Sequence, residues 1–168
     1  MHKTKLFSLL SLTTLLSGCF SFSGTTEYKG IRFPQTTSSE IAFQEQSIPG
    51  DCSAFAHLLM NSKMHSSGKD LSDAILQEAE DKGANLVLIG MTREMVKEDL
   101  EENRFDYYGP EYAYNFDKTW LGWKFGFNDW NDADGLVGLD AGTWGNSDIS
   151  FNSSLLIQAV FLRCGQDH

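Results

Sequence analysis

The sequence predicts a small α+β fold: a small sheet with one main helix packed on it, plus a long aromatic-rich insertion before the last strand. Three stretches carry this prediction, an amphipathic helix over residues 71–82 and two apolar runs over 84–90 and 155–164. Runs of this length are typical of strands buried in a sheet. We expect the order strand, strand, helix, strand, then a long excursion and a final strand, around one hydrophobic core.

Two short strands are expected before the helix. Residues 28–33 form the first, which ends at Pro34, and residues 41–48, whose apolar residues alternate only roughly, form the second. A Pro-Gly pair closes the second strand. Residues 54–60 are apolar and short, so periodicity leaves them open between helix and strand.

The helix over residues 71–82 is the most clearly marked element. Asp70 is the expected N-cap, because its side chain can accept a hydrogen bond from the first turn. Gly83 is expected to end the helix in the left-handed conformation that glycine adopts without strain. The apolar stripe has a spacing of three and four residues and consists of Leu71, Ala74, Ile75 and Ala79.

Length and charge bound the organisation of the chain. Its 168 residues suit one domain, expected over residues 28–168 with the insertion at 94–152. Without the first 18 residues, which hold two lysines and no acid, the chain carries 11 basic and 23 acidic side chains. Nucleic acid is excluded as a partner on this basis, because affinity for phosphate backbones comes from clustered Lys and Arg.

The N-terminus has the pattern of an export signal. Two lysines precede an apolar run over residues 6–16, about half the length needed to span a bilayer. The run leads into Leu-Ser-Gly-Cys at residues 16–19, which resembles the lipobox of bacterial lipoproteins. This resemblance implies a signal peptide over residues 1–18, cleavage before Cys19 and attachment of diacylglycerol to the Cys19 thiol. The alternative is a secreted protein with an incidental cysteine.

The resemblance to lipoproteins also implies a location. Residues 19–27, rich in Ser, Thr and Gly, are expected to be a flexible tether between the lipid and the domain. Two or three acyl chains give stable anchoring in a membrane. Phe20 stands where an Asp would resemble the inner-membrane retention signal, so the outer membrane is favoured.

Three cysteines are present, and the lipid would occupy Cys19. Cys52 and Cys164 remain, and export would place them in an oxidising compartment, so we expect a disulfide between them. The alternatives are two free thiols or a metal-binding pair.

A short motif marks the junction between the expected helix and the strand after it. Residues 79–87 read Ala-Glu-Asp-Lys-Gly-Ala-Asn-Leu-Val, with a Pro-Gly-Asp-Cys turn before the helix and a Cys-bearing strand near the end of the chain. This pattern resembles small periplasmic lipoproteins, among them the DUF4156 family and the Rcs stress-sensor lipoprotein. The resemblance covers residues 40–93 and 153–164 and implies an α+β fold there.

The insertion at residues 94–152 is where a specific function is expected. Thirteen of the 21 aromatic side chains fall between residues 105 and 151, so plain disorder does not explain this segment. The aromatic residues either pack on the core sheet or form a recognition surface for a protein, a glycan or the membrane interface. The candidate binding residues are Tyr112, Trp120, Trp123 and Trp130.

Two patterns suggest metal ligands, and neither is specific. Residues 130–135 contain the Asp-x-Asp-Gly part of a calcium loop, but Trp and Ala stand where the first and twelfth ligands belong. Soft side chains at near-helical spacing could hold Cu(I), although Met and His on one face more often simply pack. This set consists of His57, Met60, Met64 and His65.

No nucleophile and base occur in a hydrolase-like motif, so catalysis is the least favoured reading. The sequence therefore predicts a non-enzymatic binding or sensing module, with no metal or other cofactor, anchored in a membrane through its lipid and contacting an envelope protein. A structural or assembly role in an envelope complex is the alternative, followed by a periplasmic hydrolase.

Overall fold

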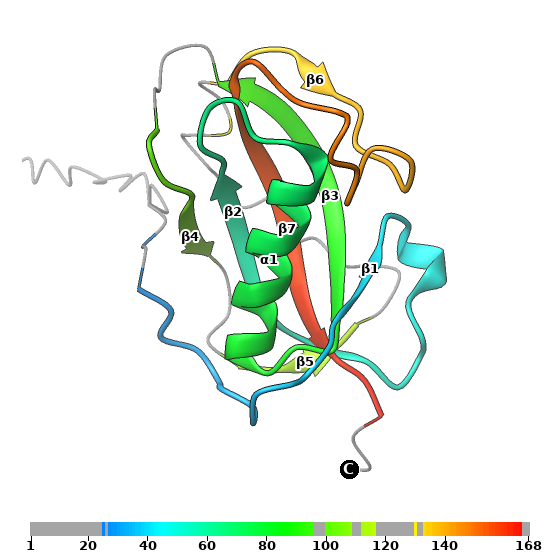
Figure 1. Ribbon diagram of the computed structural model, residues 1–168. Helices are drawn as coiled ribbons and strands as arrows, with labels where there is room; N and C mark the ends of the chain where they lie inside the picture. The colour runs from blue at the N-terminus through cyan, green and yellow to red at the C-terminus, as the bar shows by residue number, and fades with distance from the viewer. Residues whose placement is uncertain are drawn as a thin grey trace, which may run out of the picture.

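The computed structural model describes residues 25, 27–95, 100–108, 112–116, 130 and 133–165. They form a mixed sheet with one main helix packed across it (Figure 1), which confirms the predicted fold class. The elements in chain order are β1 (Glu40–Ala42), a 3₁₀ turn (Glu45–Ser47), β2 (Ser53–Asn61), α1 (Gly68–Lys82), β3 (Leu86–Met95), β4 (Arg104–Tyr108), β5 (Tyr114–Asn115), β6 (Leu136–Val137) and β7 (Ser154–Arg163).

The seven-stranded sheet has the order β1-β3-β7-β2-β4, with β5 added beside β2 and β6 beside β3. β1 runs parallel to β3, and the other pairs are antiparallel. The last strand of the chain, β7, therefore lies in the middle, between β3 and β2 (Figure 1). The expected insertion contributes β4, β5 and β6 to this same sheet.

One face of the sheet is covered by α1, and we call it the helix-covered face. Its side chains form a single apolar cluster with the buried stripe of the helix, because alternate residues of each strand point to the same side. The cluster includes Leu71, Ile75 and Ala79 of α1 and Phe55, Leu58, Met60, Val87, Ile89, Leu155, Ile157, Ala159 and Phe161 of the strands.

The helix begins three residues earlier than predicted. Ser67 is the N-cap, and Asp70 is the third helical residue of a capping box in which each side chain bonds the other residue's backbone N–H. The prediction of Asp70 as N-cap was therefore wrong, since an acid is equally favourable in the first turn. Gly83 ends the helix at φ 86°, in the left-handed conformation predicted for it.

The strands expected before the helix differ from those observed. Residues 28–33 form no strand: the Phe33 N–H donates to the Lys82 carbonyl at the end of α1, and the Tyr28 hydroxyl lies within hydrogen-bond distance of the Ile31 and Phe55 carbonyls. The strand expected over residues 41–48 is β1 alone, and the 3₁₀ turn follows it. Residues 54–60, for which the sequence did not decide between helix and strand, belong to the strand β2.

No helix in the described part of the chain is long and apolar enough to cross a membrane.

Candidate functional site

The opposite side of the sheet contains no residue of α1, and we call it the helix-free face in that sense alone, since Trp130, which packs there, is itself helical. It carries two apolar clusters: Ala42, Cys52, Ala54, Leu86, Leu88, Phe116, Val160 and Leu162 form one, and Leu59, Tyr108, Ala133 and Leu156 form the other. Between them lie His57, Asn61 and Gln158, polar residues that replace apolar ones at inward positions of β2 and β7. All three are buried.

His57 is held by the insertion. Its Nε2 lies 2.6 Å from the hydroxyl of Tyr114, and the two rings meet edge to face with centroids 5.7 Å apart. Burial lowers the pKa of His57 from 6.5 to about 4, because the charged imidazolium would lose its hydration. The imidazole is therefore neutral at physiological pH and serves as a hydrogen-bonding group rather than a charge.

Gln158 lies in the middle of β7 and is fully buried. The β3 strand has an irregularity between Ile89 and Thr92, and there the N–H of Met91 donates to the Gln158 side-chain oxygen at 3.2 Å. The Gln158 Nε2 has no hydrogen-bond partner within the described ranges. The Gln158 oxygen therefore takes part in a hydrogen bond within the described part of the sheet, whereas the Gln158 nitrogen does not.

Asn61 is the second buried amide of this face. It lies at the end of β2, opposite Leu156 of β7 and Arg104 of β4, with no exposed surface. Neither its Oδ1 nor its Nδ2 has a hydrogen-bond partner among the residues that the structure describes. A buried amide left unpaired costs about 1–3 kcal/mol of stability, so such groups call for an explanation beyond packing.

Trp130 is partly buried and packs against the cluster that contains Leu59 and Leu156. Arg93 of β3 fixes its position. The guanidinium lies 5.2 Å from the centroid of the indole ring, and its Nη1 donates to the Trp130 carbonyl at 2.6 Å. Its Nε donates to the Asp134 carbonyl at 2.8 Å. Leu136, opposite Arg93 on β6, is 72% exposed. Arg93 therefore joins a partly buried aromatic ring, Trp130, to the pair of strands that carries the exposed Leu136.

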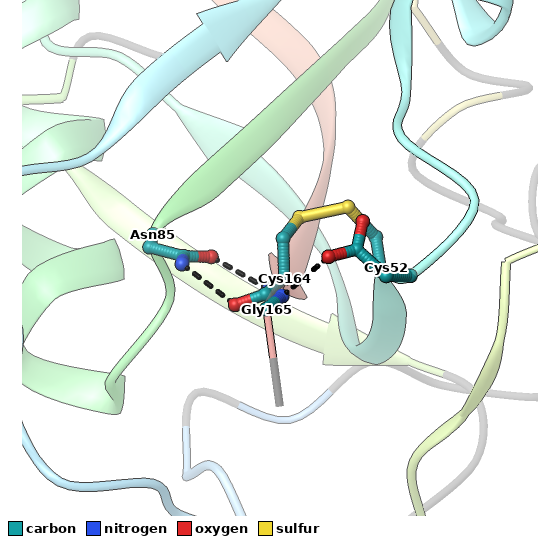
Figure 2. The surroundings of a disulfide bond; sticks show 5 residues. Cys52, Asn85, Cys164 and Gly165 are labelled. Atoms are coloured by element: carbon teal, nitrogen blue, oxygen red, sulfur yellow. Dashed lines mark hydrogen bonds between the residues drawn. A yellow bond between two sulfur atoms is a disulfide. The ribbon is translucent and has the colours of Figure 1, made fainter. Parts of the chain in front are cut away.

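A disulfide joins Cys52, before β2, to Cys164, after β7, across a separation of 112 residues (Figure 2). Asn85 holds the Cys164 backbone from both sides: its amide nitrogen donates to the Cys164 carbonyl at 3.0 Å, and its oxygen accepts from the Cys164 N–H at 2.8 Å. The Cys52 carbonyl accepts from the N–H of Phe116 in the insertion. The bridge therefore fastens the edge of the helix-free face where β5 docks.

The predicted binding residues are only partly placed. Tyr112 is 63% exposed, and Trp130 is partly buried in the environment just described. Trp120 and Trp123 lie outside the described residues, as does the predicted lipid acceptor Cys19. Other aromatic residues of the insertion pack in the interior, including Tyr107, Tyr108 and Phe116.

The sequence analysis gave simple packing as the more common outcome for His57, but it did not single out either amide. The available signal was a polar residue inside or directly after a strand-length apolar run: Gln158 interrupts the run over 155–164, and Asn61 follows the run over 54–60. Whether such a residue points inward depends on the strand register, and a one-residue shift would reverse it.

The structure does not bring His57 and Met60, two of the suggested copper ligands, together on β2. His57 lies on the helix-free face, whereas Met60 belongs to the helix-covered cluster, because residues three apart on a strand point to opposite sides. No group of three or more His, Cys, Asp or Glu side chains placed to hold a metal occurs in the described part of the chain. Residues 131 and 132 of the calcium-like pattern are outside the described ranges.

A shallow pocket of about 270 Å³ opens on the edge of β3, between the segments paired with β1 and β6. Its lining is mostly apolar: Phe43, Glu45, Leu88, Ile89, Gly90 and Met91. Glu45 supplies the single carboxylate of this lining and His57 is not part of it, so this pocket does not gather an acid–base pair.

No family model, curated protein or solved structure matches this chain. The resemblance to small periplasmic lipoproteins thus stays a prediction that rests on the lipobox and on the motif of residues 79–87.

Proposed function

We propose that this protein is a lipid-anchored lipoprotein of the cell envelope, at the outer membrane and facing the periplasm, which acts as a non-enzymatic binding or sensing module. The anchor would be the lipidated Cys19, and the binding element would be the helix-free face. Two features support the compartment: the Leu-Ser-Gly-Cys motif at residues 16–19 and the disulfide, a bond that persists in oxidising compartments.

The observation that carries the binding role is the pair of buried amides, Asn61 and Gln158. Side-chain amides both donate and accept, so they suit neutral hydrogen-bonding partners such as a peptide backbone or sugar hydroxyls. Their unused polar atoms cost stability in the described structure, and a partner that satisfied them would recover it.

Burial of these amides favours sensing over simple docking. Ala133 and Trp130 pack over Leu59 and Leu156, the apolar neighbours of the two amides on this face. A ligand reaches the amides only when this cover moves, so binding would be coupled to a shift between two conformations. The exposed Leu136 and Tyr112 would then meet a protein partner.

The binding role is tested by captured partners from crosslinked envelopes. Asn61→Leu combined with Gln158→Met removes both amides at nearly constant volume. Thr92→Val is the matched control, because Thr92 is a buried polar residue without a hydroxyl partner in the described ranges, on the helix-covered face. We expect the double variant to lose partners that wild type and Thr92→Val retain. Identical partner lists for all three proteins would reject the binding role.

The anchor is tested separately. Cys19→Ser should leave the precursor unprocessed by lipoprotein signal peptidase and change its location, and globomycin should block processing of the wild type. A Cys19→Ser protein that stays membrane-bound and fully processed would show that the lipobox interpretation is wrong.

A further inference from the structure

The N-terminal tether joins the folded domain much earlier than its composition suggests. Thr25 pairs with Tyr107 on the outer edge of β4: the Tyr107 N–H donates to the Thr25 carbonyl at 2.7 Å, and the Thr25 N–H donates back at 3.2 Å. Tyr28 then packs against Tyr107, with ring centroids 4.9 Å apart. The chain therefore contacts the sheet at Thr25 and again at Tyr28.

This attachment limits the distance between the lipid and the domain. Six peptide units separate Cys19 from Thr25. Since an extended chain covers at most 3.3–3.6 Å per residue, Thr25 lies within about 20 Å of the lipidated sulfur. A domain held this closely can take only orientations in which Thr25, and with it the β4 edge, lies within about 20 Å of the lipid.

The segment that follows Tyr28 carries exposed basic side chains. Lys29 and Arg32 are exposed cations, and Ile31 between them is 39% exposed. Glu27, which precedes Tyr28, lies 3.9 Å from Lys29. The Arg32 guanidinium lies 5.8 Å from the centroid of the Tyr28 ring and makes a cation–π contact with it. Near this segment on α1, Glu78 and Lys82 form an ion pair at 2.7 Å, and the exposed Asp81 accepts a hydrogen bond from the Gln35 amide at 3.2 Å.

We infer that residues 29–32 form a membrane-contact surface for anionic phospholipid headgroups, which orients the domain with its β4 edge toward the lipid and its β1 and β6 edges away from it. The inference rests on the proposed anchoring at Cys19. The domain as a whole is acidic, so an anionic membrane surface repels most of it. The two exposed cations near the anchor are attracted instead, so the domain would face the membrane with this segment. Screening confines this attraction to groups within about 8 Å of the surface at physiological salt, which favours the segment nearest the tether.

Two lysines allow a matched test. The side chains of Lys29 and Lys69 are 59% and 57% exposed, and each is paired with one carboxylate. The lipidated protein is placed on phosphatidylcholine vesicles with and without phosphatidylglycerol, and amine acetylation is followed by mass spectrometry. We expect the rate at Lys29 to fall severalfold on the anionic vesicles while the rate at Lys69 is unchanged. Equal rates at the two lysines on anionic vesicles would overturn the inference.

A charge variant tests the cause of the protection. Arg32→Glu keeps Lys29 as the reporter and should abolish its protection, whereas Lys63→Glu, with the same change of charge away from the segment, should not. Protection that survives Arg32→Glu would contradict a headgroup contact.

A second preparation separates this inference from the proposed function. The chain from Cys19 onward is coupled through that thiol to a maleimide lipid, which sets the anchor whether or not the cell lipidates the protein. Failure of processing in cells with normal Lys29 protection on these vesicles would reject the anchor alone. Normal processing with unprotected Lys29 would reject the orientation alone.

Discussion

The two faces of the sheet are built on different plans. The helix-covered face is an apolar cluster that α1 closes with the side chains of its buried stripe, and α1 directly links β2 to β3. The helix-free face is covered by residues from distant parts of the chain and contains His57, Asn61 and Gln158 among its apolar residues. The apolar packing of the helix-covered face stabilises the fold. The helix-free face contributes less stability, because it buries polar groups that packing does not need.

The largest expected effect comes from the disulfide, which fastens the helix-free face. The double variant Cys52→Ser, Cys164→Ser should lose about 4–5 kcal/mol of unfolding free energy, because the bridge closes a loop over a separation of 112 residues. Urea denaturation measures this loss. Wild type in reductant should match the variant, and a variant as stable as the oxidised protein would contradict the expected role of the bridge.

Loss of the disulfide should loosen the helix-free face more than the helix-covered face. The Phe116 amide, bonded to the Cys52 carbonyl, should exchange its hydrogen faster in the double variant than amides of α1 do. Uniform acceleration would show that the two faces are not separable.

Phe161→Ala tests the helix-covered face. Phe161 is fully buried in its cluster, so the variant should lose about 4 kcal/mol by lost transfer energy and a new cavity. Differential scanning calorimetry reports the change. The His57–Tyr114 contact on the other side should survive, and Tyr114 NMR shifts that move as much as those of α1 would weaken the distinction between faces.

His57 gives the helix-free face a pH dependence. Its folded-state pKa of about 4 lies below the ordinary 6.5, so the unfolded chain binds the proton more readily. The contribution is fully present above pH 6.5, is lost as pH falls toward 4, and reaches about 3 kcal/mol. His57→Gln should flatten the unfolding free energy across this window. His65→Gln, at a histidine outside the buried set, is the control and should keep the wild-type slope.

The smallest expected effect has the opposite sign. Asn61→Leu should raise the unfolding free energy by about 1 kcal/mol, since an unpaired buried amide is replaced by an apolar group of similar volume. Urea denaturation at neutral pH measures it. A clear loss of stability would mean that the Asn61 amide is satisfied in the folded protein, and the argument for a ligand contact would fail.

The sequence predicted well what short-range patterns determine. The stripe of α1 follows from periodicity, the turn at Gly83 follows from the conformational freedom of glycine, and the two long strands follow from continuous apolar runs. The chain before the helix was predicted less well, because Tyr28 and Phe33 bond to groups 27 and 49 positions away, which local patterns do not contain.

The helix-free face was beyond sequence reasoning for a similar reason. The inward direction of Asn61 and Gln158 is set by the register between β2 and β7. The aromatic content of the insertion did predict contacts, but only the structure divides these residues between core, as with Tyr107, and surface, as with Tyr112.

The central place of β7 has a consequence for how the chain acquires its structure during synthesis. Until residues 154–163 are available, β3 and β2 have no strand between them and the sheet exists as two unjoined halves. Domains commonly begin to fold as they leave the ribosome, N-terminal parts first, but here the two halves of the sheet cannot join until residues 154–163 have been synthesised.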